Sequence, residues 1–267
     1  MDLFQGQSWD VGAKDYTAFA RFTKLYCDDM AQDIAARLSP DARLLDMATG
    51  TGSAVIAIVE RTGDVPISIS ATDVSPAMLE LMKREVEKAS CKVQVETKVA
   101  DLCDHRCYPD SSFDAITCAF GVMFSADPIR TAAEILRLLR PGATAYILTW
   151  HFISNFAELE DIAIAQGSLE VYKNSKSLLG AFSKDEGSIR SVFRQGGFQP
   201  GNIDIQFLQH TGFLTVEEFV AMLDSNPVIV AKGPWNAEVA KQVLARKADG
   251  AGNIPLFGTA ILTKVTR

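Results

Sequence analysis

The sequence predicts an α/β fold, a doubly wound, mostly parallel sheet, and three observations support this class. Short apolar runs alternate with amphipathic helical patterns between about residues 40 and 150. A glycine turn joins the first apolar run to the first helix, at 46–55. Polar residues suited to ligand binding follow the later apolar runs, at the strand ends where open α/β sheets bind ligands.

The first strand and its turn, 44–55, restrict the kind of ligand. Gly50 and Gly52 permit backbone torsions that side chains forbid and let a ligand approach the main chain. No Lys-Ser/Thr pair follows Gly52, as a phosphate-binding P-loop needs, and Val55 occupies the third small position of the dinucleotide fingerprint. Asp46 lies within the strand, where its carboxylate favours a cationic or amino-bearing ligand.

The residues before this strand predict a helix that ends at Ser39-Pro40, with an aromatic stripe on one face. Such a helix can simply pack on the domain. It can also cover the ligand as a lid, with Tyr16 and Thr23 as polar contacts to the ligand's amino-acid end. The two interpretations are compatible.

The second strand, Ile67–Thr72, ends in Asp73, which lies 23 positions after Gly50. An acidic residue at this offset is typical of a ribose-binding carboxylate, although it can also be a favourable charge at a helix start. Ser75-Pro76 begins a helix that we expect to reach about Ala89. A third strand, 93–99, leads to Asp101 and Leu102, which are suited to an adenine amine and ring.

Two further strands complete the predicted core, at 113–120 and 143–150. A helix face between them ends at Arg140-Pro141-Gly142. Cys103, His105 and Cys107 lie close together, but no second ligand cluster at zinc spacing accompanies them, so we predict no metal site.

After residue 150 the regular alternation stops. Residues 151–182 resemble an insertion over the substrate, and Ser183-x-x-Glu186 and Thr215-x-x-Glu218 predict helix capping boxes. The remaining expected elements are a strand at 202–208, a helix at about 237–247 and a strand at 255–264. We predict one domain, 1–267, comprising a helical lid (1–39), a ligand-binding core (40–150) and a substrate cap with C-terminal strands (151–267).

Composition narrows the classes of partner. The net charge of −7 argues against nucleic-acid binding, which normally uses a basic surface. No run of about 18 apolar residues indicates a membrane span, and no signal peptide is apparent near the start. Five cysteines without framework spacing fit a reducing compartment, so we expect a cytoplasmic protein, monomeric or homodimeric.

Residues 40–150 resemble the class I S-adenosylmethionine (SAM)-dependent methyltransferases. Asp46, Gly50 and Gly52 match the family's D-x-x-x-G-x-G, and 110–114 (D-S-S-F-D) before an apolar strand and L-R-P-G before the next are similar to its later motifs. The resemblance implies a seven-stranded sheet with an antiparallel last strand. The whole chain looks most similar to small fungal methyltransferases of secondary metabolism, such as the gliotoxin thiomethyltransferase, through Leu25-Tyr26, Ala119-Phe120-Gly121, Thr149-Trp150 and Pro255-Leu256.

The same resemblance implies a role for each matching residue. Asp46, Ala48, Gly50 and Gly52 would hold the methionine part of SAM. Asp73 with Val74 would hold the ribose. The adenine and sulfonium surroundings would be formed by Met78, Asp101, Leu102, Ala119 and Phe120.

The sequence therefore predicts a SAM-dependent methyltransferase that acts on oxygen, sulfur or nitrogen of a small, hydrophobic, natural-product-type acceptor. His151, which follows the fifth strand, is the candidate base, although a thiol or carboxylate acceptor needs none. Possible pocket-lining residues are Trp9, Met123, Phe152, Phe156 and Trp235. Two alternatives stay open: a protein that binds SAM without methyl transfer, and a nicotinamide-dependent oxidoreductase, which Val55 opposes.

Overall fold

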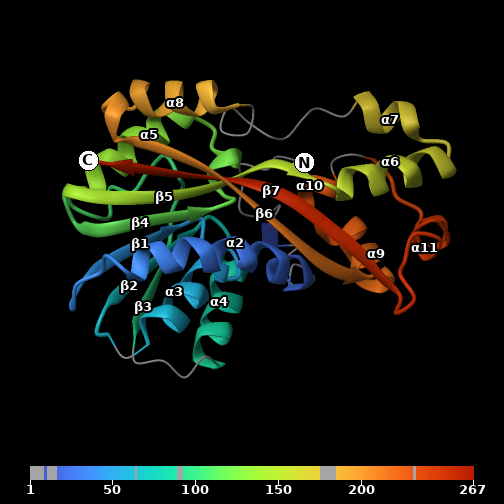
Figure 1. Cartoon of the computed structure of the whole chain (residues 1–267), viewed down its shortest axis with the longest axis horizontal. Helices are drawn as coiled ribbons and strands as arrows, with labels where there is room; N and C mark the ends of the chain where they lie inside the picture. Colours follow the sequence, from blue (N-terminus) through green and yellow to red (C-terminus); the bar gives the residue numbers. More distant parts are fainter. Residues whose placement is uncertain (1–8, 11–16, 64, 89–92, 175–184, 231–232) are drawn as a thin grey trace.

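The computed structural model describes residues 9–10, 17–63, 65–88, 93–174, 185–230 and 233–267. A single sheet with the strand order β3-β2-β1-β4-β5-β7-β6 runs through the molecule (Figure 1). Its strands are β1 (Arg43–Met47), β2 (Ser68–Asp73), β3 (Gln94–Val99), β4 (Phe113–Ala119), β5 (Leu139–Ile153), β6 (Ile203–Thr215) and β7 (Asn253–Thr266). β1 to β5 pair in parallel, whereas β7 is antiparallel to both of its neighbours. The predicted fold class is confirmed.

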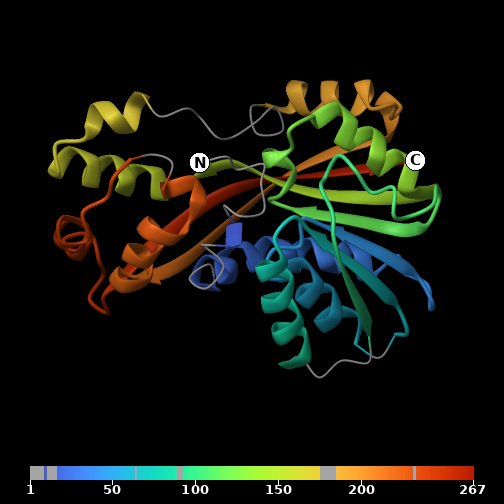
Figure 2. The ribbon, with the colours of Figure 1, turned by 180° about the vertical axis from the view of Figure 1, so that it is seen from behind.

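Helices cover both faces of the sheet, as a doubly wound fold requires. α2 (Thr17–Ala35), α3 (Ser53–Thr62) and α4 (Pro76–Lys88) lie on one face. α5 (Pro128–Leu138) and α8 (Glu186–Gln195) lie on the other, seen best from behind in Figure 2. The central strands lie between these layers, so β1 and β4 are buried along most of their length rather than at alternate residues.

β6 and β7 extend beyond the parallel core and carry a group of helices at one end of the molecule (Figures 1 and 2). We call this group the cap. It comprises α6 (Asn155–Ala165), α7 (Leu169–Asn174), α9 (Val216–Ser225), α10 (Pro227–Val230) and α11 (Ala237–Ala245). α11 packs on both α6 and α9. Two short 3-10 turns, η2 (Val122–Phe124) and η4 (Pro200–Asn202), complete the described elements.

Several predicted boundaries were wrong. β5 starts at Leu139 and includes Pro141, while β6 continues seven residues beyond the expected end at Leu208 to Thr215. The helix expected to begin with a Ser183 cap is instead capped by Asp185, whose carboxylate accepts from Ser188 N at 2.8 Å. Ser183 lies outside the described residues.

The Thr215–Glu218 capping box is confirmed, with both of its reciprocal hydrogen bonds present. No helix in the described part of the chain is long and apolar enough to cross a membrane. The division into lid, core and cap at residues 39/40 and 150/151 stays a prediction, as does the oligomeric state.

Candidate active site

A cavity opens at the carboxyl ends of β1 to β4, where the sequence placed its ligand-binding residues. It is lined by main-chain and side-chain atoms from four strand ends, with α2 and η2 closing its sides. Eleven predicted cofactor residues line it: Thr23, Asp46, Ala48, Gly50, Asp73, Val74, Met78, Asp101, Leu102, Ala119 and Phe120. We call it the first cavity.

The glycine loop between β1 and α3 shapes the floor of this cavity. Gly50 has φ 54°, and a Cβ placed there would meet no atom within 4 Å, so the residue faces open space. Gly52, at φ 90°, serves helix packing instead, because a Cβ there would lie 2.5 Å from Met82 Cγ on α4. Gly52 therefore permits close packing of α3 and α4, and it does not line the cavity.

Asp73 holds the glycine loop and remains at the cavity wall. Its Oδ2 accepts from Gly50 N at 2.8 Å and its Oδ1 from Ser75 N at 2.9 Å. Burial raises the pKa of Asp73, and the backbone hydrogen bonds oppose that rise. A carboxylate oxygen has more than one lone pair, so each oxygen retains capacity for a ligand hydroxyl.

Asp46 is 1% exposed at the end of β1. Its Oδ1 accepts from Thr117 Oγ1 at 2.6 Å, whereas its Oδ2 has no hydrogen-bond partner within the described structure. The nearby hydroxyl of Thr49, also on the cavity wall, is buried and likewise makes no hydrogen bond of good geometry within the described structure. Burial raises the pKa of Asp46 to about 6, and the neighbouring hydroxyls of Thr117 and Thr49 oppose that rise. Buried polar groups normally have partners, so this end of the cavity fits a ligand that donates hydrogen bonds.

Trp9 and Asp10 close the cavity; the sequence analysis assigned Trp9 to the acceptor pocket and gave Asp10 no role. Trp9 lies across the cavity, edge-on to Phe124 with ring centroids 5.0 Å apart. The adjacent Asp10 accepts from Ser75 Oγ at 2.5 Å and from Ala77 N at 3.3 Å, which ties this segment to the start of α4. No local pattern in the sequence indicates this long-range contact. Tyr16 lies outside the described residues.

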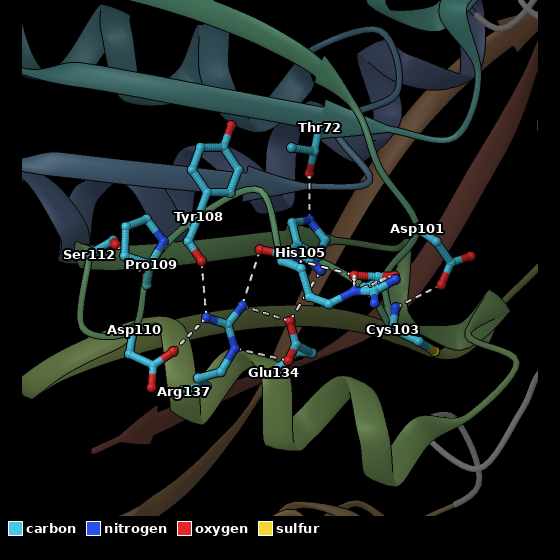
Figure 3. Close-up of polar contacts among 12 residues, drawn as sticks. Thr72, Asp101, Cys103, His105, Tyr108, Pro109, Asp110, Ser112, Glu134 and Arg137 are labelled. Carbon is cyan, nitrogen blue, oxygen red and sulfur yellow. Dashed lines mark hydrogen bonds and ion pairs between the residues drawn. The ribbon is translucent and has the colours of Figure 1, made fainter.

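The loop after β3, which carries Asp101 and Leu102, is fixed by α5 (Figure 3). Arg137 donates to the carbonyls of His105 at 3.1 Å and Tyr108 at 3.0 Å. Glu134 pairs with Arg137 at 2.9 Å and accepts from His105 N at 3.1 Å. These bonds satisfy backbone groups that lie outside helices and strands, and so hold this wall of the first cavity in place.

His105 is a structural residue. Its Nε2 lies 3.0 Å from Thr72 Oγ1, next to Asp73, and burial lowers its pKa to about 4, so the ring is neutral at pH 7. Cys103 contacts Ser125 and Thr131 instead of pointing at His105. Across the described ranges, no three His, Cys, Asp or Glu side chains gather as a metal site would require.

A second cavity adjoins the first and shares Trp9, Phe120 and Phe124 with it. Of the predicted acceptor-pocket residues, Trp9, Met123 and Phe156 line it. The other lining residues are Phe19, Trp150, Ile153, Asn155, Asn226, Val228 and Ile229. Most of them come from the cap or from α2, and the sequence analysis did not assign them to this pocket.

Phe120 and Trp150 form the wall between the sheet and the second cavity. Their rings stack with centroids 4.1 Å apart, and Phe22 of α2 also stacks with Trp150, with centroids 5.7 Å apart. Phe120 adopts φ 59°, a left-handed conformation that is unusual for an aromatic residue. Backbone strain of this kind gathers at functional sites, and here it fixes the ring where the two cavities meet.

Besides Gly52, three sequence-predicted residues among those described line neither cavity. His151 is exposed and packs edge-on against Phe207 of β6, so the structure gives no support to its role as a base. Phe152 is 51% exposed and packs beside Phe257. Trp235 donates a hydrogen bond from Nε1 to the Ile229 carbonyl at 2.9 Å. It therefore supports a segment that lines the second cavity, although Trp235 itself is not part of the lining.

Comparison with known proteins identifies the type of domain in the core. Residues 44–142 match a family model described as a methyltransferase domain. The ubiquinone/menaquinone biosynthesis C-methyltransferase UbiE of Geotalea daltonii is 38% identical over 112 residues, which are 42% of this chain and 47% of that protein. The match thus spans less than half of the relative. These findings do not support the closer resemblance to fungal secondary-metabolite enzymes, which stays a prediction.

Solved structures share the fold over most of the chain. The YcgJ protein from Bacillus subtilis has a TM-score of 0.58 at 14% identity, covering 91% of this chain and 99% of that one. The [4+2]-cyclase SpnF has a TM-score of 0.53 at 18% identity, covering 90% of this chain and 81% of that one. At these identities the likeness concerns the fold and not the activity.

Proposed function

We propose that this protein is a SAM-dependent methyltransferase that acts on a small, apolar acceptor. The observation that carries the proposal is the joining of two cavities at Phe120. One carries polar groups at strand ends, from Asp46, Gly50 and Asp73, and the other is aromatic. The methyltransferase-domain match over 44–142 supports the same assignment for the first cavity.

The first cavity fits the chemistry of SAM part by part. The unpartnered Asp46 Oδ2 and Thr49 hydroxyl would accept from an ammonium group, and the open space at Gly50 would admit the amino-acid portion. Asp73 would accept from the ribose hydroxyls, since each carboxylate oxygen keeps a free lone pair. Val74, Met78, Asp101 and Leu102 would surround the adenine.

When bound, SAM supplies a methyl group on a positively charged sulfur for in-line displacement. The chain's own contribution is then alignment and exclusion of water, which Trp9, Phe120 and Phe124 would provide at the junction of the cavities. No Asp, Glu, His, Lys, Tyr or Cys is found among the described residues lining the second cavity. This composition favours an acceptor that needs no protein base, such as a thiolate, a carboxylate or an activated carbon.

The acceptor atom has two candidate assignments. Methylation of a natural-product-type oxygen, sulfur or nitrogen is supported by the aromatic lining of the second cavity. The name of the Geotalea relative instead suggests carbon methylation of a quinone precursor as a second candidate. The family-model match ends at residue 142, before Trp150, Asn155 and Phe156, so the acceptor side is not covered by it.

Replacing Asp73 tests the cofactor assignment. We expect Asp73→Asn to weaken SAM binding about 10- to 100-fold, because charge-assisted hydrogen bonds to the ribose are lost. Isothermal titration calorimetry measures the affinity, and circular dichroism verifies that the variant is folded. Asp224→Asn, on an exposed part of α9, is the matched control and should bind as the wild type does. Equal SAM affinity in a folded Asp73→Asn variant would refute the ribose role.

Methyl transfer needs a separate test, because SAM can be bound without being used. Incubating the protein with SAM and a panel of thiol, phenol and hydroquinone acceptors should release S-adenosylhomocysteine and a methylated product, detected by mass spectrometry. Tight SAM binding with no product from any acceptor would favour a binding or non-transferring function for this fold instead. Binding of NADH but not SAM would favour the oxidoreductase.

A further inference from the structure

The second cavity is lined by aromatic rings and by no charged side chain among the described residues. Its described lining side chains are uncharged, and aromatic rings from five parts of the chain surround it. These rings are Trp9, Phe19, Phe124, Trp150 and Phe156, with Phe120 at the junction. A charged ligand group would be desolvated here without a countercharge, whereas a flat apolar body would contact ring faces and edges.

Asn155 introduces one polar group into this lining. It is the first residue of α6 and only 5% of it is exposed. Its carboxamide Oδ1 is fully buried and has no hydrogen-bond partner within the described structure. Burying a carbonyl without a partner is unfavourable, so an unpartnered amide in a ligand cavity needs an explanation.

Local structure does not supply that explanation. The residue before it, Ser154, is the N-cap of α6 and makes no side-chain capping bond; its hydroxyl accepts from Phe257 N at 3.0 Å. The other carboxamide among the described lining residues, Asn226, has a partner for its oxygen, because its Oδ1 accepts from Val228 N at 3.0 Å and so shapes the start of α10. Asn155 is thus the described lining carboxamide whose oxygen lacks any partner and would gain most from a ligand donor.

We propose that the second cavity takes an uncharged aromatic acceptor bearing one hydrogen-bond donor, and that Asn155 orients this acceptor by accepting from its hydroxyl or N–H. The inference rests on the proposed function for the identity of the ligand as methyl acceptor. It assigns Asn155 as a specificity-determining residue, since molecules that lack the donor would leave its buried oxygen unpaired.

The test uses small probes of matched shape. 2-Naphthol carries a hydroxyl where 2-methylnaphthalene carries a methyl group, so only the first can donate a hydrogen bond. 2-Naphthalenesulfonate has the same ring system and a negative charge. Fluorescence titration gives the affinity of each probe for the protein, with and without saturating S-adenosylhomocysteine. We expect the wild type to prefer 2-naphthol to 2-methylnaphthalene about tenfold, and to bind the sulfonate more weakly than either.

Asn155→Leu, which is nearly isosteric, should abolish the preference for 2-naphthol while 2-methylnaphthalene affinity stays the same or rises. The melting temperature of the ligand-free variant should stay the same or rise, since an unpaired buried oxygen is removed. Asn155→Ala gives the same comparison if the leucine variant does not fold. Asn202→Leu, at an exposed turn, is the control and should keep the preference.

Equal binding of the two neutral probes by the wild type, or a tenfold preference that survives in Asn155→Leu, would overturn the assignment of Asn155. Failure of the wild type to bind any probe, or stronger binding of the sulfonate, would overturn the uncharged aromatic class. Because the titrations are also made without nucleoside, they remain informative if SAM fails to bind, and such a failure would refute the proposed function separately.

Discussion

Asp46 is buried at the end of β1, with one carboxyl oxygen bonded to Thr117 and the other without a partner in the described structure. Burial raises its pKa from 3.8 to about 6. The unfolded chain therefore loses this proton at lower pH than the folded protein does, and the resulting cost to the folded state is fully present above about pH 6. The same unpaired oxygen could accept from a ligand ammonium. The ionised carboxylate of Asp46 would therefore lower the stability of the ligand-free fold and strengthen ligand binding.

We predict that Asp46→Asn raises the free energy of unfolding of the ligand-free protein at pH 7 by up to about 3 kcal/mol. The gain should shrink to about 1 kcal/mol at pH 4.5, where the folded wild type is already protonated. SAM affinity should fall, because the ammonium loses an anionic partner. Urea unfolding at both pH values and calorimetry of SAM binding measure these effects. A variant that is less stable at pH 7, or binds SAM as tightly as the wild type, would contradict this role of Asp46.

Helix α5 supports the loop that carries Asp101 and Leu102. The guanidinium of Arg137, on this helix, donates hydrogen bonds to two carbonyls of that loop. We predict that Arg137→Met lowers the free energy of unfolding by about 1 to 3 kcal/mol. The Tyr108 carbonyl loses its side-chain donor, and the His105 carbonyl keeps only its bond from Tyr108 N. It should also weaken SAM binding, since the adenine side of the first cavity loosens. Chemical unfolding and SAM titration are the measurements.

Arg130→Met is the matched control, because this residue is exposed on the same helix. It should change the free energy of unfolding by less than about 0.5 kcal/mol. Equal effects of the two substitutions would mean that the loop is not held by Arg137.

The sequence predicted elements well where local pattern and burial agree. β1, β2 and β4 are short apolar runs ending in turns, and each was placed within one or two residues. β5 was predicted to start too late, because Arg140-Pro141-Gly142 looks like a helix stop, and to end too early, because His151 looks like the start of a loop. β5 in fact pairs with β7 past Trp150, with a register shift between Trp150 and Phe152. This continuation explains why a residue just after the predicted strand end does not face the site.

The first cavity was predictable for a related reason, whereas only part of the second was, through Trp9, Met123 and Phe156. The carboxyl ends of parallel strands lie along one edge of the sheet, so residues 46, 73, 101 and 120 could be grouped from their places at predicted strand ends, together with the family resemblance. The second cavity gathers Trp9, Asn155 and Ile229 from segments far apart in the chain. Their proximity depends on how the cap helices pack, and no periodicity in the sequence encodes that packing.

At the scale of the whole molecule, β6 and β7 join the cap to the core. They pair with each other over their full length, and β7 also pairs with β5 along most of that strand. α9 continues directly from the end of β6 at Thr215, and Lys247 links the chain after α11 to Glu158 of α6 at 3.6 Å. Separating the cap from the core would therefore break a continuous antiparallel ribbon, which favours a single cooperative unit.

We predict that cap and core unfold together in urea, as the expected single domain requires. The chain has three tryptophans, and Trp9→Phe with Trp150→Phe leaves Trp235 as a reporter within the cap. Its fluorescence transition should coincide in midpoint and slope with the far-ultraviolet circular dichroism transition of the same variant. Trp235→Phe, with Trp9 and Trp150 retained, reports the region of the two cavities and should give one shared midpoint for fluorescence and circular dichroism. A fluorescence transition of Trp235 at clearly lower urea than the circular dichroism change would show that the cap is a separate folding unit, because only an independent cap can melt while the parallel sheet persists.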